Sequence, residues 1–107
     1  MPIPINLDDL LSLPQPPVLI DVRKAPARSS SGRTIPDAER GEPERATEWG
    51  LAFRGRRVVV FCVHGHEVSQ GVADALTGLG IDAAYLEGGF AAWEAAGNPV
   101  VAIGARP

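Results

Sequence analysis

Short runs of apolar residues recur along the chain and are separated by proline, glycine or charged residues. Residues 18–20, 58–62 and 83–86 form the clearest runs, and residues 5–6 can add a short strand near the start. A strand that is covered on both faces needs successive apolar side chains, so these runs predict buried, mainly parallel strands. The run at residues 58–62 is the strongest, because it is rich in β-branched and aromatic residues.

Between these runs lie segments whose apolar residues have helical spacing. Helices are predicted for residues 7–13, 44–53, 69–79 and 90–96. The first has Asn6 as its cap and ends at Pro14. The third keeps apolar residues at positions i, i+3, i+4 and i+7 and ends at Gly80. The alternation of strands and helices predicts an α/β domain with a mostly parallel sheet.

The segment from residue 24 to residue 45 shows neither pattern. It contains Ala-Pro and Gly-Glu-Pro breaks, a run of serines and five basic residues: Lys24, Arg28, Arg33, Arg40 and Arg45. Loops longer than about 12 to 15 residues are usually functional or disordered. We therefore predict one long surface loop here, with basic residues that are either solvated or available to a functional site.

Composition narrows the class of protein. The chain has 107 residues, 45% of them hydrophobic, and a formal net charge of −3, which predicts a single folded domain over residues 1–107. No apolar run approaches the ~18 residues that span a bilayer, and the first residues lack the basic region of a secretory signal. The acidic balance argues against nucleic-acid binding. We therefore expect a soluble, cytoplasmic protein that binds neither membrane nor nucleic acid.

The single cysteine, Cys62, lies between the strand at residues 58–62 and the helix at residues 69–79. Its lack of a partner excludes an internal disulfide. In open α/β sheets, ligands bind beyond the carboxyl ends of the strands, where loop N–H groups and a helix N-terminus can hold an anion and stabilise a thiolate. Gly65 would let such a loop curl tightly. The residues alone leave two interpretations open, a nucleophile or a small buried hydrophobic residue.

Three segments give the chain a resemblance to the rhodanese family. Residues 18–23 resemble the opening strand and Asp-Val-Arg motif, residues 59–65 the active-site strand and loop, and residues 85–93 the Leu-x-Gly-Gly-x-x-x-Trp element. The resemblance covers roughly residues 5 to 100. It implies a three-layer sandwich, in which a central, mainly parallel five-stranded sheet has helices on both sides.

The same resemblance implies an activity. Rhodanese domains are sulfurtransferases that move sulfane sulfur, from thiosulfate or a persulfide, through a cysteine persulfide to cyanide or a thiol. The expected nucleophile is Cys62, the expected partners are a small sulfur-donor anion and a thiol acceptor, which can be a protein, and no cofactor is expected. The expected anion-binding loop consists of Val63, His64, Gly65, His66, Glu67 and Val68.

This loop departs from the sulfurtransferase pattern in length. Counted from Cys62 to Val68 it has seven residues, one more than the usual loop, and resembles in length that of cell-division-cycle phosphatases and related arsenate reductases. Those relatives end the loop with an arginine that grips the oxyanion, whereas this chain has Val68. Two alternatives therefore stay open: an enzyme that handles arsenate, chromate or phosphate, and a non-catalytic module that binds anions or senses oxidation.

Other residues have supporting roles in this hypothesis. Asp21 and Arg23 are expected to form a structural ion pair or to shape the floor of the loop, and Arg33 lies near the position of a histidine in the family pattern. Glu67 opposes a thiolate and repels anionic substrates; it can point to solvent, bind a neighbour or act as a general acid. His64 and His66 can supply charge, a proton or only the shape of the loop.

The spacing Cys62-x-His64-x-His66 also raises the possibility of a metal site. A thiolate and two imidazoles suit zinc or copper. However, a curled loop points alternate residues in different directions, and no fourth ligand is evident. The sequence therefore predicts no metal.

Overall fold

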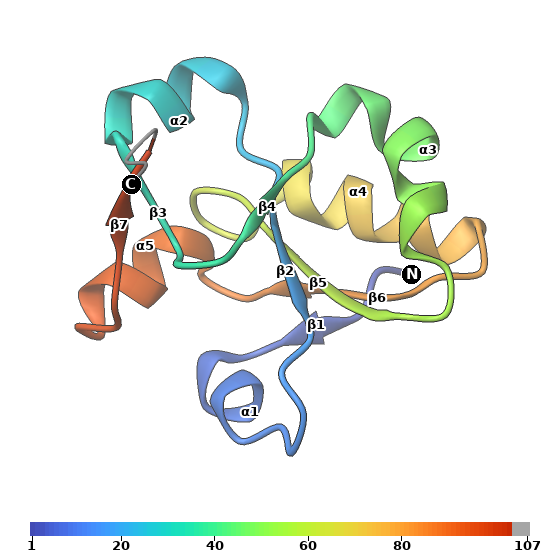
Figure 1. The fold of residues 1–107 in the computed structure, drawn as a ribbon, viewed down its shortest axis with the longest axis horizontal. Helices are drawn as coiled ribbons and strands as arrows, with labels where there is room; N and C mark the ends of the chain where they lie inside the picture. Colours follow the sequence, from blue (N-terminus) through green and yellow to red (C-terminus); the bar gives the residue numbers. More distant parts are fainter. Residues whose placement is uncertain (104–107) are drawn as a thin grey trace.

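A five-stranded parallel sheet forms the centre of the protein, whose computed structural model describes residues 1–103 (Figure 1). The order of its strands is β1-β6-β5-β2-β4. Their bounds are Pro4–Ile5 (β1), Val18–Asp21 (β2), Glu39–Arg40 (β4), Arg57–Phe61 (β5) and Asp82–Leu86 (β6). Each pair of neighbours in the sheet runs parallel, which confirms the predicted sheet.

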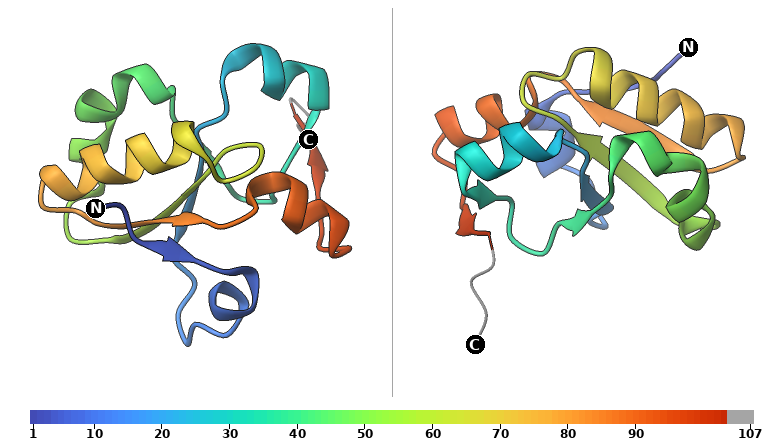
Figure 2. Two further views of the ribbon diagram at one scale, coloured as in Figure 1. Left: turned by 180° about the vertical axis from the view of Figure 1, so that it is seen from behind. Right: turned by 90° about the horizontal axis from the view of Figure 1, so that it is seen from above.

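Helices cover both faces of the sheet (Figures 1 and 2). The described residues form the α-helices α1 (Leu7–Leu11), α2 (Ala25–Ser31), α3 (Ala46–Trp49), α4 (Glu67–Gly78) and α5 (Gly89–Ala95). One core cluster joins the sheet to α3 and α4, and a second joins it to α1 and α5. The predicted three-layer α/β architecture is therefore confirmed.

The central strand β5 shows how the sequence divides these two cores. Val58 and Val60 face the α4 side, whereas Val59 and Phe61 face the α5 side, and all four are at most 1% exposed. Successive side chains of a strand point to opposite faces, so an all-apolar run suits a strand that is covered on both. In register, Val18 pairs with Val58 and Asp21 with Phe61, so β2 and β5 end at the same level.

The prediction of one long loop over residues 24–45 is wrong. The segment contains α2, the short strands β3 (Arg33–Thr34) and β4, and the 3-10 helix η1 (Pro43–Arg45). β3 pairs antiparallel with β7 (Val101–Ala102) in a separate two-stranded sheet. Helix α2 has Pro26 in its first turn and Gly32 as a left-handed C-cap, with φ of 69°. Proline near the start and glycine just past the end are helix boundary signals, but the intervening Ala-Arg-Ser-Ser-Ser run hid them.

Other boundaries also differ from the prediction. The helix expected over residues 44–53 is divided into η1, α3 and a second 3-10 helix, η2 (Gly50–Phe53). Gly50 lies against the side chain of Leu76, where an added Cβ would come within 2.5 Å of it, so this part of the chain packs too closely for a larger residue. Helix α4 begins at Glu67, two residues before the expected start, and β5 ends at Phe61, immediately before Cys62.

Candidate active site

Cys62 is the first residue after β5, and its side chain lies at the base of a cavity beyond the carboxyl ends of the central strands. The cysteine is only 5% exposed. The cavity has a volume of about 340 Å³ and is lined by Arg23, Lys24, Ala27, Cys62, Val63, His64, His66, Glu67 and Val68. It therefore brings together the cysteine, most of the predicted loop and one turn of α2.

The loop after Cys62 is oriented by the start of α5. The N–H of Phe90 donates to the Cys62 carbonyl at 2.8 Å, and the N–H of Ala91 donates to the Val63 carbonyl at 3.0 Å. In a trans peptide the C=O and the following N–H point in opposite directions, so the N–H groups of Val63 and His64 point away from α5. Within residues 1–103, the loop N–H groups from 63 to 68 donate no backbone hydrogen bond. These donors are therefore free to hold an anion.

Two glycines allow the loop to approach the turn between β6 and α5. Gly65 has φ of 75°, and a Cβ there would lie 2.6 Å from the Leu86 carbonyl oxygen. Gly89 has φ of 60°, and a Cβ there would overlap the Cys62 carbonyl. Larger residues at either position would be strained and would push the loop away. The prediction that Gly65 lets the loop curl with positive φ is confirmed.

Ser69 contacts the cysteine and was missed in the sequence. The thiol of Cys62 donates to the Ser69 hydroxyl oxygen at a sulfur-to-oxygen distance of 3.1 Å, and both residues are buried. When the sulfur is a thiolate, the hydroxyl can instead donate to it. A signal was present, because Ser69 shares the buried face of α4 with Val72, Ala73 and Leu76. A serine in an apolar stripe needs a polar partner in the interior.

The remaining polar loop residues lie at the mouth of the cavity. His64, His66 and Glu67 are exposed, and the two histidine rings are 6.1 Å apart between centroids. Glu67 and Val68, the last two residues of the expected loop, belong to the first turn of α4. Among residues 1–103, no group of three or more His, Cys, Asp or Glu side chains is placed so that it could hold a metal ion.

Asp21 and Arg23 form a buried ion pair beneath the cavity. The guanidinium Nε and Nη2 of Arg23 donate to Oδ1 and Oδ2 of Asp21 at 3.0 and 2.8 Å, and both side chains are 1% exposed. Burial raises the pKa of Asp21, but hydrogen bonds and charge from Arg23, with a hydrogen bond from Thr34, lower it more, so the pKa lies below its ordinary 3.8. Arg23 also lies over the Phe90 ring, 4.4 Å from its centroid. This is the structural pair that the sequence predicted.

Further donors complete a cluster around this carboxylate. Arg28 Nε and the Thr34 hydroxyl donate to Asp21 Oδ2 at 3.1 and 2.9 Å, and Arg40 Nη1 donates to the Asp21 and Arg23 carbonyls. We call these five residues, Asp21, Arg23, Arg28, Thr34 and Arg40, the Asp21 cluster. It joins α2, β3 and β4 to the end of β2.

Arg33 does not line the Cys62 cavity, contrary to the expectation that it would support the site. It forms an ion pair with Glu94 of α5 at 3.0 Å and is half exposed. It lines a neighbouring cavity of about 450 Å³, which shares Arg23, Ala27 and Val63 with the first. The pairing of β3 with β7 places Arg33 beside α5, and this pairing between distant segments is not visible in local sequence spacing.

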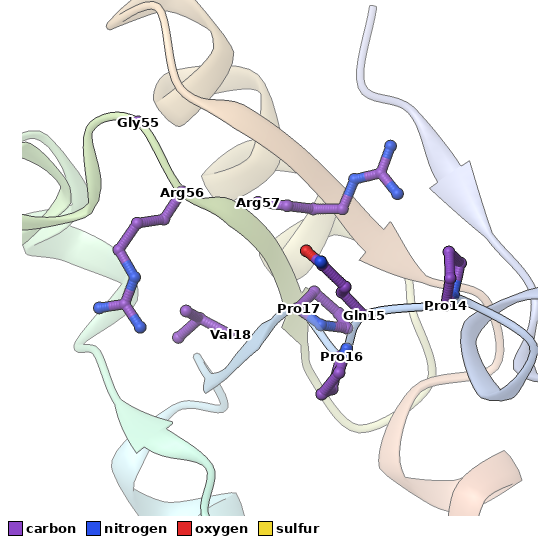
Figure 3. Close-up of a pocket in the computed structure, with 8 residues that line it drawn as sticks. All are labelled: Pro14, Gln15, Pro16, Pro17, Val18, Gly55, Arg56 and Arg57. Atoms are coloured by element: carbon purple, nitrogen blue, oxygen red, sulfur yellow. The ribbon is translucent and has the colours of Figure 1, made fainter.

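A further cavity, of about 480 Å³, lies at the amino-terminal ends of β2 and β5, away from Cys62 (Figure 3). Its walls are a proline-rich segment, residues 14–18, and the turn at residues 55–57. The guanidinium groups of Arg56 and Arg57 point to different sides, and Arg57 pairs with Asp82 at 3.3 Å. Because its charged groups do not converge, this cavity offers no catalytic arrangement comparable with the one around Cys62.

Comparison with known proteins assigns the family. The family model of the rhodanese-like domain matches residues 6–96, so this chain belongs to the rhodanese-like domain family. It is similar to a rhodanese-related protein from Thermoplasma volcanium, at 27% identity and a TM-score of 0.79, with 92% of this chain and 97% of that chain covered. It is also similar to a rhodanese-like domain protein from Staphylococcus aureus, at 27% identity and a TM-score of 0.72, with 85% and 90% covered.

A third neighbour has a different description. A protein of unknown function from Rhodopseudomonas palustris, described as a possible tyrosine phosphatase, is 23% identical, with a TM-score of 0.65 and 78% of this chain and 70% of that chain covered. At this identity the likeness concerns the fold alone. A search of curated proteins finds no match. In the described part of the chain, no helix has the length and apolar character to cross a membrane.

Proposed function

We propose that the protein is a sulfurtransferase in which Cys62 carries sulfane sulfur as a persulfide. The observation that carries this proposal is the setting of the Cys62 sulfur. It lies in a cavity, within 3.1 Å of the Ser69 hydroxyl, at the start of a loop whose N–H groups donate no backbone hydrogen bond within residues 1–103. Donors of this kind stabilise negative charge on sulfur, as a thiolate before the transfer and as a persulfide after it. Membership of the rhodanese-like family supports the same conclusion.

The first half-reaction loads the cysteine. The Cys62 thiolate attacks the outer sulfur of a donor, either thiosulfate or a persulfide, and a new sulfur–sulfur bond forms. The bond within the donor breaks, and its electron pair leaves with sulfite or with the thiolate of the donor. The loop N–H groups, fixed by the carbonyl contacts to Phe90 and Ala91, stay in place through this step and need no reorganisation.

The second half-reaction transfers the outer sulfur from Cys62 to the acceptor. A thiolate or cyanide attacks the outer sulfur of the Cys62 persulfide, and the electron pair of the broken bond returns to the Cys62 sulfur. Because Cys62 is buried, the acceptor must enter the cavity from its mouth, past the exposed His64, His66 and Glu67. We propose a thiol as the natural acceptor, on a small molecule or a protein in the cytoplasm.

Oxyanion chemistry has less support in the site. Val68 lines the cavity where an oxyanion-handling relative has its arginine. The arginines nearby are engaged elsewhere, since Arg23 and Arg28 bind Asp21. Without an arginine at the end of the loop, phosphate or arsenate would lose its bidentate, charge-assisted contact. A non-catalytic module would have the same fold but would not turn over, so a turnover measurement separates it from the proposal.

The proposed function is tested by turnover. The protein is supplied with thiosulfate or a small persulfide as donor and with cyanide as acceptor, and the thiocyanate formed is measured. We expect repeated turnover by the wild type and none by Cys62→Ser, with both proteins folded as judged by circular dichroism. Thiocyanate formation at the same rate by both proteins, or at no rate above the buffer with any donor, would contradict the proposal.

A further inference from the structure

Glu67 places a carboxylate on the wall of the Cys62 cavity. It is the first residue of α4, it is exposed, and it lines the same cavity as the cysteine. Among residues 1–103 it takes part in no side-chain hydrogen bond or ion pair that would offset its charge. A donor that approaches Cys62 therefore meets a negative charge close to the point of reaction.

Most of the arginines around the cavity bind groups other than Glu67. Arg23 uses its Nε and Nη2 groups to bind Asp21 and the Arg33 carbonyl. Arg33 is paired with Glu94. Of the cations that line the cavity, this leaves Lys24, an exposed side chain of the segment between β2 and α2. Lys24 and Glu67 cancel in formal charge, so Glu67 offsets the exposed lysine that would otherwise attract a dianion, and the remaining positive charge belongs to the arginines around Asp21.

Apolar side chains complete the wall. Ala27, Val63 and Val68 line the same cavity as Lys24 and Glu67. Such a surface favours an organic group over the strongly hydrated end of a dianion, because desolvating charge without compensation is costly. The apolar lining and the charge of the cavity therefore both favour an organic donor over a dianion.

We propose that Glu67 is a specificity-determining residue that favours organic persulfides, R–S–SH, over dianionic donors such as thiosulfate. This inference rests on the proposed function and names the donor of the same site. The Cys62 thiolate takes the outer SH sulfur of the donor and becomes Cys62–S–SH, while the broken bond leaves its electron pair on R–S⁻. With thiosulfate the leaving group is the sulfite dianion. Glu67 repels the negative charge of thiosulfate as it approaches and that of sulfite as it forms.

The test compares two donors of different charge. Second-order rate constants for loading Cys62 are measured with thiosulfate and with the persulfide of 2-mercaptoethanol, which carries at most one negative charge. For Glu67→Gln we expect the rate with thiosulfate to rise roughly three- to tenfold, as Coulomb repulsion in a water-like, salt-screened medium gives, and the rate with the persulfide to change less than about twofold.

Two further variants make the comparison decisive. Glu48→Gln removes an exposed carboxylate of α3 and changes the net charge by the same amount, so it isolates the effect of overall charge. Glu67→Ser removes the charge with a residue that is favoured at helix starts, and serves if the glutamine variant folds poorly. Raising the ionic strength should accelerate the thiosulfate reaction more in the wild type than in either Glu67 variant.

The outcomes separate the two proposals. A selective gain with thiosulfate at Glu67, absent in Glu48→Gln, supports the role of Glu67. An equal change with both donors, no change, or an equal gain in Glu48→Gln overturns it while the sulfurtransferase assignment stands. Failure of both donors to load Cys62 overturns the assignment and the role together.

Discussion

At the scale of single residues, the sulfur of Cys62 contacts one hydroxyl group and lies at the start of a loop whose N–H groups donate no backbone hydrogen bond within residues 1–103. The Ser69 hydroxyl of α4 lies 3.1 Å from this sulfur. The Cys62 and Val63 carbonyls accept hydrogen bonds from α5, so the N–H groups that follow them in the chain point away from α5. Hydrogen bonds to charged groups are worth about 1.5 to 3 kcal/mol, more than those between neutral groups. Under the proposed function, Ser69 is therefore a positioning residue for the thiolate, and Cys62 is the residue that reacts.

Replacing Ser69 by alanine should lower the reactivity of the thiol. We expect the rate of Cys62 alkylation by iodoacetamide at pH 7 to fall about fivefold or more, because one charge-assisted hydrogen bond to the thiolate is lost. Thr77→Ala, which removes an exposed hydroxyl from the same helix, serves as the matched control and should leave the rate unchanged. Equal alkylation of Ser69→Ala and the wild type, with both folded, would show that the hydroxyl contact has no effect on the thiolate.

Prediction from sequence succeeded for residues whose conformation follows from the local chain. The place of Cys62 at the end of a buried strand and the positive φ of Gly65 were predicted correctly, because a buried strand, a cysteine and a glycine-containing loop follow one another directly. Ser69 was missed because serine is common at helix starts, although its place in the buried stripe of α4 was a usable signal. Arg33 was misplaced because its position depends on the pairing of β3 with β7, which lie far apart in the sequence.

At the scale of elements, the Asp21 cluster attaches one side of the site to the sheet. The Asp21 carboxylate accepts hydrogen bonds from Arg28 of α2 and Thr34 of β3, in addition to its pair with Arg23. Arg40 of β4 donates to the backbone of the same segment. Since Lys24 and Ala27 on the cavity wall belong to or adjoin α2, the cluster also fixes the distance between α2 and the loop after Cys62.

Asp21→Asn should strongly destabilise the fold. Removing one partner of a buried ion pair costs about 3 to 5 kcal/mol, because the remaining charge, here on Arg23, is left uncompensated. The free energy of unfolding is measured by urea denaturation. Asp82→Asn, which breaks the exposed pair with Arg57, is the control and should cost less than about 1 kcal/mol. Equal losses in the two variants would contradict the structural role of the cluster.

The same carboxylate gives the stability of the wild type a pH dependence. The folded pKa of Asp21 lies below its ordinary 3.8, so the unfolded chain binds the proton more readily. The contribution of Asp21 to the free energy of unfolding is therefore complete above the pKa of the unfolded chain, near pH 4. It is lost as the pH falls through the pKa of the folded protein. Asp21→Asn should show a smaller fall in stability below pH 4 than the wild type.

The elements were predicted well where packing follows the local pattern. Strands β2, β5 and β6 were found because each is an apolar run covered on both faces. Helix α2 was missed because none of its residues is buried, so it has no apolar stripe that could reveal it. The strand β4 was missed for a related reason, since a two-residue edge strand with glutamate and arginine carries no strand pattern.

At the scale of the whole molecule, the parallel sheet makes the site possible. β2 and β5 end in register, and this places Asp21 level with the last residue before Cys62. The loops that leave the two strands therefore meet beyond one edge, between α2, α4 and α5. The overall fold was predictable because several patterns agreed on it, whereas the proposed donor class rests on a few charges of the cavity lining, which only the structure brings together.

The most direct test of the central claim is the intact mass of the protein after exposure to a sulfur donor. The wild type is incubated with thiosulfate or with the persulfide of 2-mercaptoethanol, freed of excess donor and analysed by mass spectrometry. We predict a gain of one sulfur atom, located on Cys62, absent in Cys62→Ser and removed again by a thiol. An unchanged mass with every donor, or the same gain in Cys62→Ser, would contradict the account.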